Sequence, residues 1–291
     1  MKRPRPPAPG SGMPGFPRLK RPPSLSEFQK IVLDHYRDHG RDLAWRHTTD
    51  PYRILVSEVM LQQTQVERVN VKYPVFMNAF TDFPSLAKAP LPDVLAVWQG
   101  MGYNRRAISL QKCARQVVEE FDGTLPQDPE ILATFPGIGR ATAASICAFA
   151  FNMPVVFIET NIRRVFIHFF FGDDEIVRDA DILPLVEGVM YRKNPRIWYW
   201  ALMDLGSALK NQIPNPNRRS IQYVRQSAFT GSDREIRGMI IRMLLEGPAQ
   251  DREELIRKTG GERDRVLRII SALEKDGFVT TTDTGIAIRS R

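Results

Sequence analysis

The spacing of apolar residues predicts helices through most of the chain. From Ser26 onward, Phe28, Ile31, Val32 and Tyr36 recur at helical spacing behind a serine cap. Runs that alternate between apolar and polar residues are scarce in this part of the sequence, which favours an all-α body. Proline and glycine clusters separate the helices. The further helices that we expect span residues 51–67, 70–80, 92–98, 103–121, 128–134, 140–151, 161–170, 180–191 and 196–210.

Residues 232–291 have a different order of elements and are predicted to form a separate small domain. Two amphipathic helices, a Gly260-Gly261 turn and a third helix are followed by two short β-like runs. This order is typical of a winged helix, an α+β arrangement that binds DNA or proteins. Its third helix carries arginines that either meet DNA phosphates or pair with nearby acids on a solvated face. The arginines are Arg263, Arg265 and Arg268, and the acids are Glu262, Asp264 and Glu274.

Two basic segments flank the helical domain, which we expect over residues 25–210. Residues 1–24 hold eight of the 22 prolines, six basic residues and no acid. A segment so poor in large apolar residues cannot offset its chain entropy by burial, so we expect a disordered basic arm. Residues 211–231 are polar and basic, and we expect them to form a linker.

The net charge of +8 suggests an anionic partner, but the charge is unevenly distributed over the 291 residues. The N-terminal arm carries +6 and residues 206–231 carry +4, whereas residues 25–205 carry −3. The apolar runs are too short to span a membrane. Two cysteines, Cys113 and Cys147, are too few for a disulfide framework or a four-thiolate cluster. We therefore expect a soluble intracellular protein, cytoplasmic and nucleoid-associated in a prokaryote, with no membrane partner.

A glycine-rich turn lies between two predicted helices at Phe135-Pro136-Gly137-Ile138-Gly139-Arg140. Glycine permits positive φ and a close approach of the backbone to another molecule. The amides that begin the following helix can then donate to a phosphate. The segment reads as the hairpin of a helix-hairpin-helix, which grips a DNA backbone without reading its sequence. The alternative is an ordinary turn between two helices.

Glu58 is an acid inside a mostly apolar predicted helix, and Gln-Gln-Thr-Gln follows it at residues 62–65. Val56, Val59 and Met60 surround it, so we expect desolvation to raise its pKa, as a proton donor requires. The alternative is a surface glutamate on an amphipathic helix.

Glu159 follows the apolar run of residues 155–158 and should lie at the start of a helix. Helix amides and the helix dipole favour an ionised carboxylate there. The alternative is a capping role for Glu159, Thr160 or Asn161, which is common at helix starts.

Five segments occur together in the order and at the spacing of one known family. They are Leu43-Ala44-Trp45-Arg46, Ser57 to Val66, Gly100-Met101-Gly102-Tyr103, the glycine-rich hairpin, and Ala201 to Gly206. Together they resemble the catalytic domain of MutY-type adenine DNA glycosylases, in the helix-hairpin-helix superfamily that includes endonuclease III. The resemblance covers residues 27–210, and the run Ser-Glu-Val-Met-Leu-Gln-Gln-Thr-Gln-Val is highly specific to it.

The resemblance implies roles for two carboxylates. Glu58 matches the glutamate that protonates the adenine ring, and Glu159 occupies the place of an aspartate that stabilises the positive sugar. Cleavage of the N-glycosidic bond passes through an oxocarbenium-like state, so it needs an acid near the base and an anion near the sugar.

The resemblance also implies contacts with double-stranded DNA that holds a mismatched or damaged base, because the target base must leave the duplex. Trp45, Arg46 and Asp204 fall where the family builds its base pocket. Gln62, Gln63 and Tyr103 match the wedge that fills the gap left by the flipped base. The residues expected at the DNA backbone are Gly137, Ile138, Gly139, Arg140, Asn161, Lys210, Arg218 and Arg219. The family also holds an alkali cation at the hairpin, so a monovalent cation is the one cofactor that the resemblance suggests.

Four departures from the family pattern bear on function. Glu159 is longer than the family's aspartate by one methylene, roughly 1 Å of reach, and we expect activity to be retained. Ala141 stands where bifunctional relatives carry a Schiff-base lysine, so we expect no lyase activity. Residues 206–231 lack the family's iron–sulfur cysteines, so we expect no cluster. A winged-helix-like unit replaces the C-terminal domain that helps recognise 8-oxoguanine, and Asn104 replaces a second tyrosine.

The sequence thus predicts a monomeric, monofunctional DNA glycosylase of base excision repair, which removes adenine from mispairs with guanine or 8-oxoguanine. A mismatch thymine or uracil glycosylase is the enzymatic alternative. A lesion-binding protein without catalysis is the other alternative.

Overall fold

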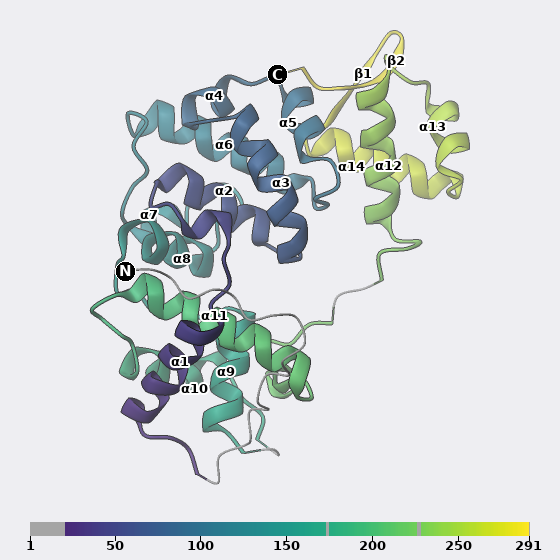
Figure 1. Ribbon diagram of the computed structural model, residues 1–291. Coiled ribbons are helices and arrows are strands. Elements are labelled where there is room, and N and C mark those ends of the chain that lie inside the picture. Colours follow the sequence, from purple (N-terminus) through teal and green to yellow (C-terminus); the bar gives the residue numbers. More distant parts are fainter. Residues whose placement is uncertain (1–20, 173–174, 226–227, 291) are drawn as a thin grey trace. The chain divides into compact units, whose positions relative to one another are not determined.

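The computed structural model describes residues 21–172, 175–225 and 228–290 of the chain. The chain forms two compact units, each built from two stretches of sequence (Figure 1). The first unit comprises Met1–Arg46 and Arg140–Arg225, and the second comprises His47–Gly139 and Gln226–Arg291. Nearly all of the arm expected at residues 1–24 lies outside the described residues. The predicted all-α body is confirmed, and among the described residues no helix is long and apolar enough to cross a bilayer.

The first unit is a bundle in which α11 packs against both α1 and α9. Helix α1 begins with a capping box, because the Ser24 side chain accepts from the Glu27 amide and Glu27 accepts from the Ser24 amide. The Phe28 ring lies 5.3 Å from that of Phe166 and 6.1 Å from that of Trp198, so aromatic residues from three helices form the core. The helices of this unit are α1 (Leu25–His39), η1 (Ala44–Arg46), α8 (Arg140–Phe151), α9 (Thr160–Phe170), α10 (Asp179–Gly188), α11 (Pro195–Gln212) and η2 (Pro216–Arg219).

The segment after α11, expected to be a linker, packs on the first unit as far as its 3-10 helix. Asn217 is buried, and its side-chain amide donates to the backbone carbonyl of Thr160 at 2.9 Å. Val177 and Ser220 form an isolated parallel bridge. Polar side chains that bond to backbone groups hold this segment in place, and a hydrophobicity pattern does not reveal such bonds.

The second unit begins with six helices, of which α2, α4 and α5 pack against α6. Helix α4 was not predicted, since Phe83-Pro84 was interpreted as a break. Proline is compatible with the first turn of a helix, and Asp82 and Ser85 form a capping box around it. The helices are α2 (Pro51–Leu61), α3 (Val66–Ala79), α4 (Phe83–Lys88), α5 (Leu91–Trp98), α6 (Arg105–Glu120) and α7 (Pro129–Leu132).

Helix α2 ends at Leu61, which corrects the expected helix over residues 51–67. The chain turns at Gln63, whose φ is +54°, and α3 begins at Val66. This short connection, residues 62–65, is called the glutamine turn below. A non-glycine residue with positive φ is uncommon, and such strain tends to be kept where function needs it.

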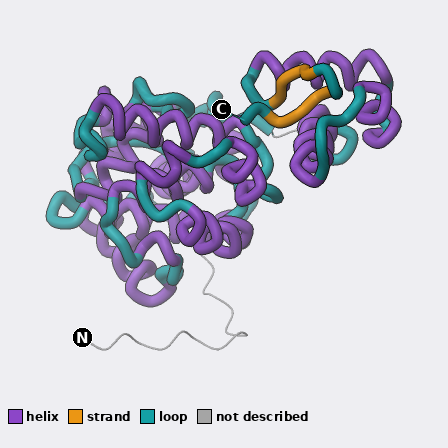
Figure 2. Tube along the Cα trace, turned by 90° about the horizontal axis from the view of Figure 1, so that it is seen from above, coloured by secondary structure: helices purple, strands orange, loops and turns teal. Residues whose placement is uncertain are grey.

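The C-terminal part of the second unit has the predicted order of helix, helix, turn, helix and hairpin. Its elements are α12 (Asp233–Glu246), α13 (Arg252–Thr259), α14 (Arg263–Lys275), β1 (Val279–Thr282) and β2 (Gly285–Ile288). Figure 2 shows the two strands in orange. They are antiparallel, with Val279 opposite Ile288 and Thr282 opposite Gly285. Gly260 ends α13 in the left-handed conformation, as a glycine C-cap does.

Candidate active site

Helix α2 presents Glu58 as a half-buried side chain between the buried residues Ser57 and Val59. Asp50 caps the helix by accepting from the amides of Tyr52 and Arg53. The adjoining residues of α2 are almost entirely buried, so the carboxyl group of Glu58 is an exception on an apolar helix. Glu58 is therefore not on a fully solvated face, and its role as a proton donor stays a prediction.

The glutamine turn directly follows the helix that carries Glu58. Gln63 is exposed and Gln62 is half-buried. The side-chain amide of Gln62 donates to the backbone carbonyl of Gly137 at 3.3 Å, so the turn contacts the glycine-rich hairpin of the same unit. Two of the segments singled out from the sequence are therefore neighbours.

Tyr103 lies in a second strained turn, which precedes α6. Its φ is +45°, and those of Gly100 and Gly102 are +84° and +68°. The guanidinium of Arg234 on α12 donates to the Tyr103 hydroxyl and lies 5.2 Å from the centre of its ring. The C-terminal part of the unit thus contacts the residue that the sequence assigns to the wedge.

The glycine-rich hairpin exposes its backbone and buries its apolar side chain. Ile138 is buried, whereas Gly137 and Gly139 are exposed. Gly137 has a φ of +76°, and a Cβ there would lie 2.8 Å from the Cβ of Ser109, so only glycine fits. No heavy atom lies within 4 Å of the position that a Cβ would take at Gly139. The backbone of the hairpin is therefore open at Gly139, and its contact with a phosphate stays a prediction.

Carbonyl oxygens of the hairpin are the kind of ligand that a monovalent cation takes. The carbonyl of Pro136 accepts from the thiol of Cys113, and that of Gly137 accepts from Gln62. Each carbonyl has a second lone pair. The donor type therefore fits the predicted cation.

Glu159 caps the N-terminus of α9 in the first unit. Its Oε1 accepts from the amides of Asn161 at 2.7 Å and Ile162 at 2.9 Å, so the capping role considered as the alternative is present. Burial raises the pKa of Glu159, although both amides and the charges of Arg164 and Arg163 act in the opposite direction. The amides favour the ionised form as expected, but burial has the larger effect.

Asn161, expected at the DNA backbone, uses its side chain inside the unit. Its amide nitrogen donates to Glu159 at 3.3 Å and its oxygen accepts from Arg164 at 2.8 Å. Arg164 is buried and also donates to the carbonyl of Gly206 at 2.6 Å. Gly206 packs so closely that a Cβ would lie 2.4 Å from the carbonyl oxygen of Asn161. These contacts fix the start of α9, and any DNA contact of Asn161 stays a prediction.

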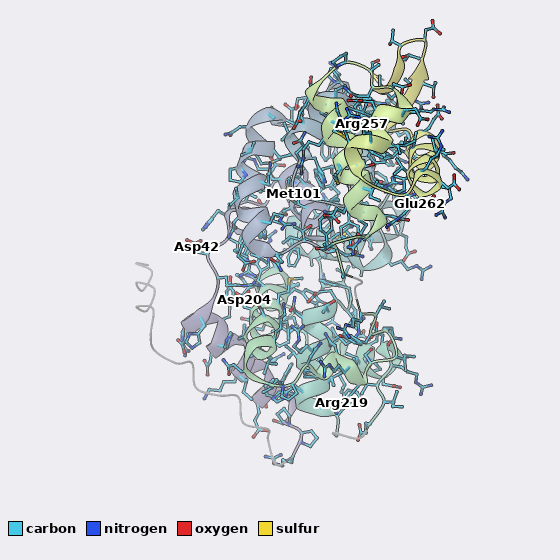
Figure 3. All side chains as sticks on the ribbon, turned by 90° about the vertical axis from the view of Figure 1, so that its right-hand side faces the viewer. Asp42, Met101, Asp204, Arg219, Arg257 and Glu262 are labelled. Atoms are coloured by element: carbon cyan, nitrogen blue, oxygen red, sulfur yellow. The ribbon has the colours of Figure 1, made fainter. Side chains whose placement is uncertain are left out.

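Of the predicted base-pocket residues, Arg46 and Asp204 form an ion pair in the first unit, and Trp45 is buried (Figure 3 labels Asp204). The Nη1 and Nη2 atoms of Arg46 donate to the Asp204 carboxylate, at 2.7 and 2.8 Å. Arg41 adds a bond at 2.7 Å from its side chain. Burial would raise the pKa of Asp204, but the hydrogen bonds and charges of these arginines lower it overall. The sequence did not predict Arg41 in this cluster, and contact of the cluster with a base stays a prediction.

The three basic residues predicted to contact the DNA backbone, in the last turn of α11 and beyond it, differ in their surroundings. Lys210 and Arg218 are exposed. Arg219 instead donates to the carbonyls of Ile167, Phe171 and Gly172, at the end of α9 (Figure 3). Its guanidinium therefore satisfies carbonyl groups that a helix end leaves unpaired.

The arginines of α14 pair with acids other than the ones considered from the sequence. Arg263 bonds to Glu253 of α13, and Arg265 bonds to Asp233 of α12 at 2.7 Å. Pairing within the domain thus accounts for two of the three arginines, which favours the solvated-face interpretation for these two.

Three further residues singled out from the sequence have clear positions. Cys113 and Cys147 are both buried, on α6 and α8. Ala141 is exposed in the first turn of α8.

Residues 56–181 match the family described as HhH-GPD superfamily base excision DNA repair protein. The match includes Glu58, both strained turns, the hairpin and Glu159. A thermostable thymine-DNA glycosylase of known structure is similar, with a TM-score of 0.59 and 27% identity over 63% of this chain and 86% of that one. The fold and the site therefore define a helix-hairpin-helix DNA repair protein.

Similarity to individual proteins shows to which family within this superfamily the chain belongs. The adenine DNA glycosylase of Mycobacterium tuberculosis is 32% identical over 281 residues, which cover 87% of this chain and 90% of that protein. The adenine DNA glycosylase of Mycolicibacterium smegmatis is 30% identical over 277 residues, 88% and 94% of the two chains. The chain belongs to the adenine DNA glycosylase family. This confirms the resemblance seen in the sequence and makes the chain a DNA N-glycosylase of base excision repair.

Proposed function

We propose that this protein is a monomeric, monofunctional glycosylase that hydrolyses the bond between adenine and deoxyribose in mispairs with guanine or 8-oxoguanine. Glu58 carries the proposal, because it is half-buried on the apolar helix α2 and the exposed Gln63 follows just beyond the end of that helix. This arrangement presents an acid beside residues able to enter a duplex. The similarity to adenine DNA glycosylases over most of the chain supports adenine as the target.

The reaction needs a proton for the base and a negative charge for the sugar. The Glu58 carboxyl group donates a proton to a ring nitrogen of adenine, and the bonding electron pair leaves with the base. The ionised Glu159, held by the amides of Asn161 and Ile162, stabilises the oxocarbenium-like sugar. Water adds to the anomeric carbon and loses a proton, which restores the Glu58 carboxyl group, and the products are free adenine and an abasic site.

Ala141 supports hydrolysis without strand cleavage. Its methyl group cannot form a Schiff base with the abasic sugar, so the strand remains intact until alkali is added. Treatment with borohydride during turnover should trap no enzyme–DNA adduct. A trapped adduct would show that another amine acts as the nucleophile.

Base release from defined duplexes tests the proposed substrate. Adenine, thymine and uracil are each placed opposite every partner base, and cleavage after alkali treatment is followed under single-turnover conditions. We expect adenine release opposite guanine or 8-oxoguanine, and a loss on the order of 10²- to 10⁴-fold in the Glu58→Gln protein. Glu67, exposed on α3, supplies the control Glu67→Gln, which should retain full activity. Equal rates for Glu58→Gln and the unchanged protein would refute the assignment.

A thymine or uracil glycosylase is the second candidate, because a thymine-DNA glycosylase shares the fold at 27% identity. The same set of duplexes separates the candidates by the base that is released. Structure-selective binding without an abasic product on any duplex would instead indicate a lesion-binding protein.

We also propose that the hairpin binds the DNA backbone with the help of a monovalent cation at its carbonyl oxygens. The openness of Gly139 supports this site. Replacement of potassium by tetramethylammonium at constant ionic strength should weaken duplex binding. Unchanged binding would rule the cation out.

A further inference from the structure

Arg106 is a buried arginine at the first turn of α6 that the proposed chemistry does not use. Its Nη1 donates to the carbonyls of Val59 and Met60 at 2.9 Å each and of Gln62 at 2.6 Å. Its Nη2 donates to the Thr64 hydroxyl at 2.9 Å, and to the carbonyls of Met101 at 3.2 Å and Gly102 at 3.0 Å. One guanidinium thus meets six acceptors from two separate stretches of chain.

Those two stretches are the glutamine turn and the turn that holds Tyr103. Val59 and Met60 belong to the last turn of α2, whose carbonyls lack partners within the helix. Gln63 and Tyr103 both have positive φ, so each turn requires an outside anchor to keep its shape. The guanidinium also lies 5.2 Å from the ring centre of Trp98 and 5.7 Å from that of Tyr103.

The connection between the two turns depends on the planar guanidinium group of Arg106 and its hydrogen bonds, and not only on the space that the side chain fills. Every group that accepts from Arg106 is electrically neutral, and burial lowers its pKa to about 10, so it stays protonated at neutral pH. Lysine has three donors on one nitrogen and cannot reach both turns in a planar fork. Methionine would fill the space but would supply no hydrogen bond to any of these acceptors, and the carbonyl of Gly102 would keep only its bond from the Trp98 indole.

We propose that Arg106 is a positioning residue, which holds the glutamine turn and the Tyr103 turn in a fixed relation and thereby sets how well the protein unstacks its target base. The inference rests on the proposed function, because it takes these two turns as the wedge. Arg106 itself touches neither base nor sugar, and acts through the backbone of the residues that do.

The test compares Arg106→Met and Arg106→Lys with Arg115→Met. Arg115 lies on the same helix and donates to the carbonyl of Ala87, away from both turns. Each protein is saturated with a duplex that carries 2-aminopurine at the target position, and the fluorescence rise reports unstacking without any chemistry. Base release is then measured from a duplex with a mispaired adenine and from one whose adenine is bulged and unpaired.

We expect both Arg106 proteins to lose most of the fluorescence rise, and Arg115→Met to keep it. Base release from the mispaired duplex should fall on the order of 10- to 100-fold, with a much smaller loss for the bulged adenine, which is already unstacked. A purely stabilising role would lower both rates equally and leave the fluorescence rise at saturation unchanged. That result would overturn the proposal.

A milder variant covers the case in which Arg106→Met does not fold. Thr64→Val removes one acceptor of Arg106 at the glutamine turn, and it should reduce the fluorescence rise in the same direction. An unchanged rise in Thr64→Val and Arg106→Lys would overturn the proposal. If the unchanged protein releases no base but shows the fluorescence rise, only the proposed function fails, since the rise still reports the wedge. If the unchanged protein shows no rise, the two turns do not open the pair and this inference fails.

Discussion

The two carboxylates of the proposed chemistry lie in different local environments. Glu58 sits within an apolar helix, whereas Glu159 accepts two backbone amides at a helix start. Buried apolar neighbours disfavour an ionised carboxylate and so suit a proton donor, whereas helix amides suit an anion. The difference between the two side chains therefore comes from their positions in helices and not from their residue type.

Burial raises the pKa of Glu159, which predicts a particular acid limit to activity. Because the ionised form is needed, base release should fall as the pH drops through this raised pKa. Aspartate has a lower ordinary pKa, so Glu159→Asp should move the acid limb of the single-turnover rate to lower pH. An acid limb at the same pH in both proteins would mean that another group sets it.

Asp204 predicts how stability responds to acid. Its side chain is 1% exposed and paired with Arg46, so Asp204→Asn should lower the free energy of unfolding by about 3–5 kcal/mol at neutral pH. The arginines lower the pKa of Asp204 in the folded protein, despite its burial, so its contribution is present above the unfolded pKa of about 3.9 and is lost as pH falls through the folded value. Urea unfolding between neutral and acidic pH should show the gap between the two proteins closing.

The exposed pair of Asp34 and Arg37 provides the control for that measurement. Asp34→Asn should change the stability by less than about 1 kcal/mol, because solvent screens the pair. A similar effect of both substitutions would contradict the assigned burial of Asp204.

At the scale of elements, the contact between α11 and α9 depends on one glycine. Gly206→Ala would place a Cβ 2.4 Å from the backbone oxygen of Asn161, so α11 must move away from α9. We expect a loss of stability of about 1–3 kcal/mol, measured by thermal unfolding, and slower base release, because Asn161 bonds to Glu159.

Gly238 lies inside α12, and no heavy atom lies within 4 Å of the position that a Cβ would take there. Gly238→Ala should therefore stabilise the protein by up to about 1 kcal/mol, and the reverse order of effects would refute the argument.

Apolar periodicity predicted most of the helices, but not where they end or what anchors them. The expected helix over residues 51–67 continued through the glutamine turn, because nothing in the apolar pattern marks a positive φ at Gln63. Helix α4 was missed because Pro84 was interpreted as a break. Arg106 could have been noticed as a charge on the apolar face of α6, but its acceptors are backbone carbonyls that only tertiary structure brings together. Sequence motifs identified the candidate site residues. They did not identify the groups to which those residues are hydrogen-bonded.

At the scale of the whole molecule, we expect some basic residues to bind DNA and others to stabilise the fold. Lys210→Ala and Arg218→Ala should each weaken DNA binding for all sequences and reduce the slope of log K against log salt by about 1. Both side chains are exposed, so the fold should not change. Arg219→Ala should instead lower the melting temperature, since its guanidinium bonds to carbonyls at the end of α9. Equal salt slopes in all three variants and the unchanged protein would show that this segment does not contact phosphate.

The Arg106 anchor has a consequence for how such proteins diversify. Five of its six acceptors are main-chain carbonyls, which every amino acid provides. Side chains on the two turns can therefore change during evolution while their backbone stays anchored. A new target base would require new side chains at the tips of the turns and no new scaffold to carry them. The same feature makes these turns suitable positions for libraries that seek altered base specificity.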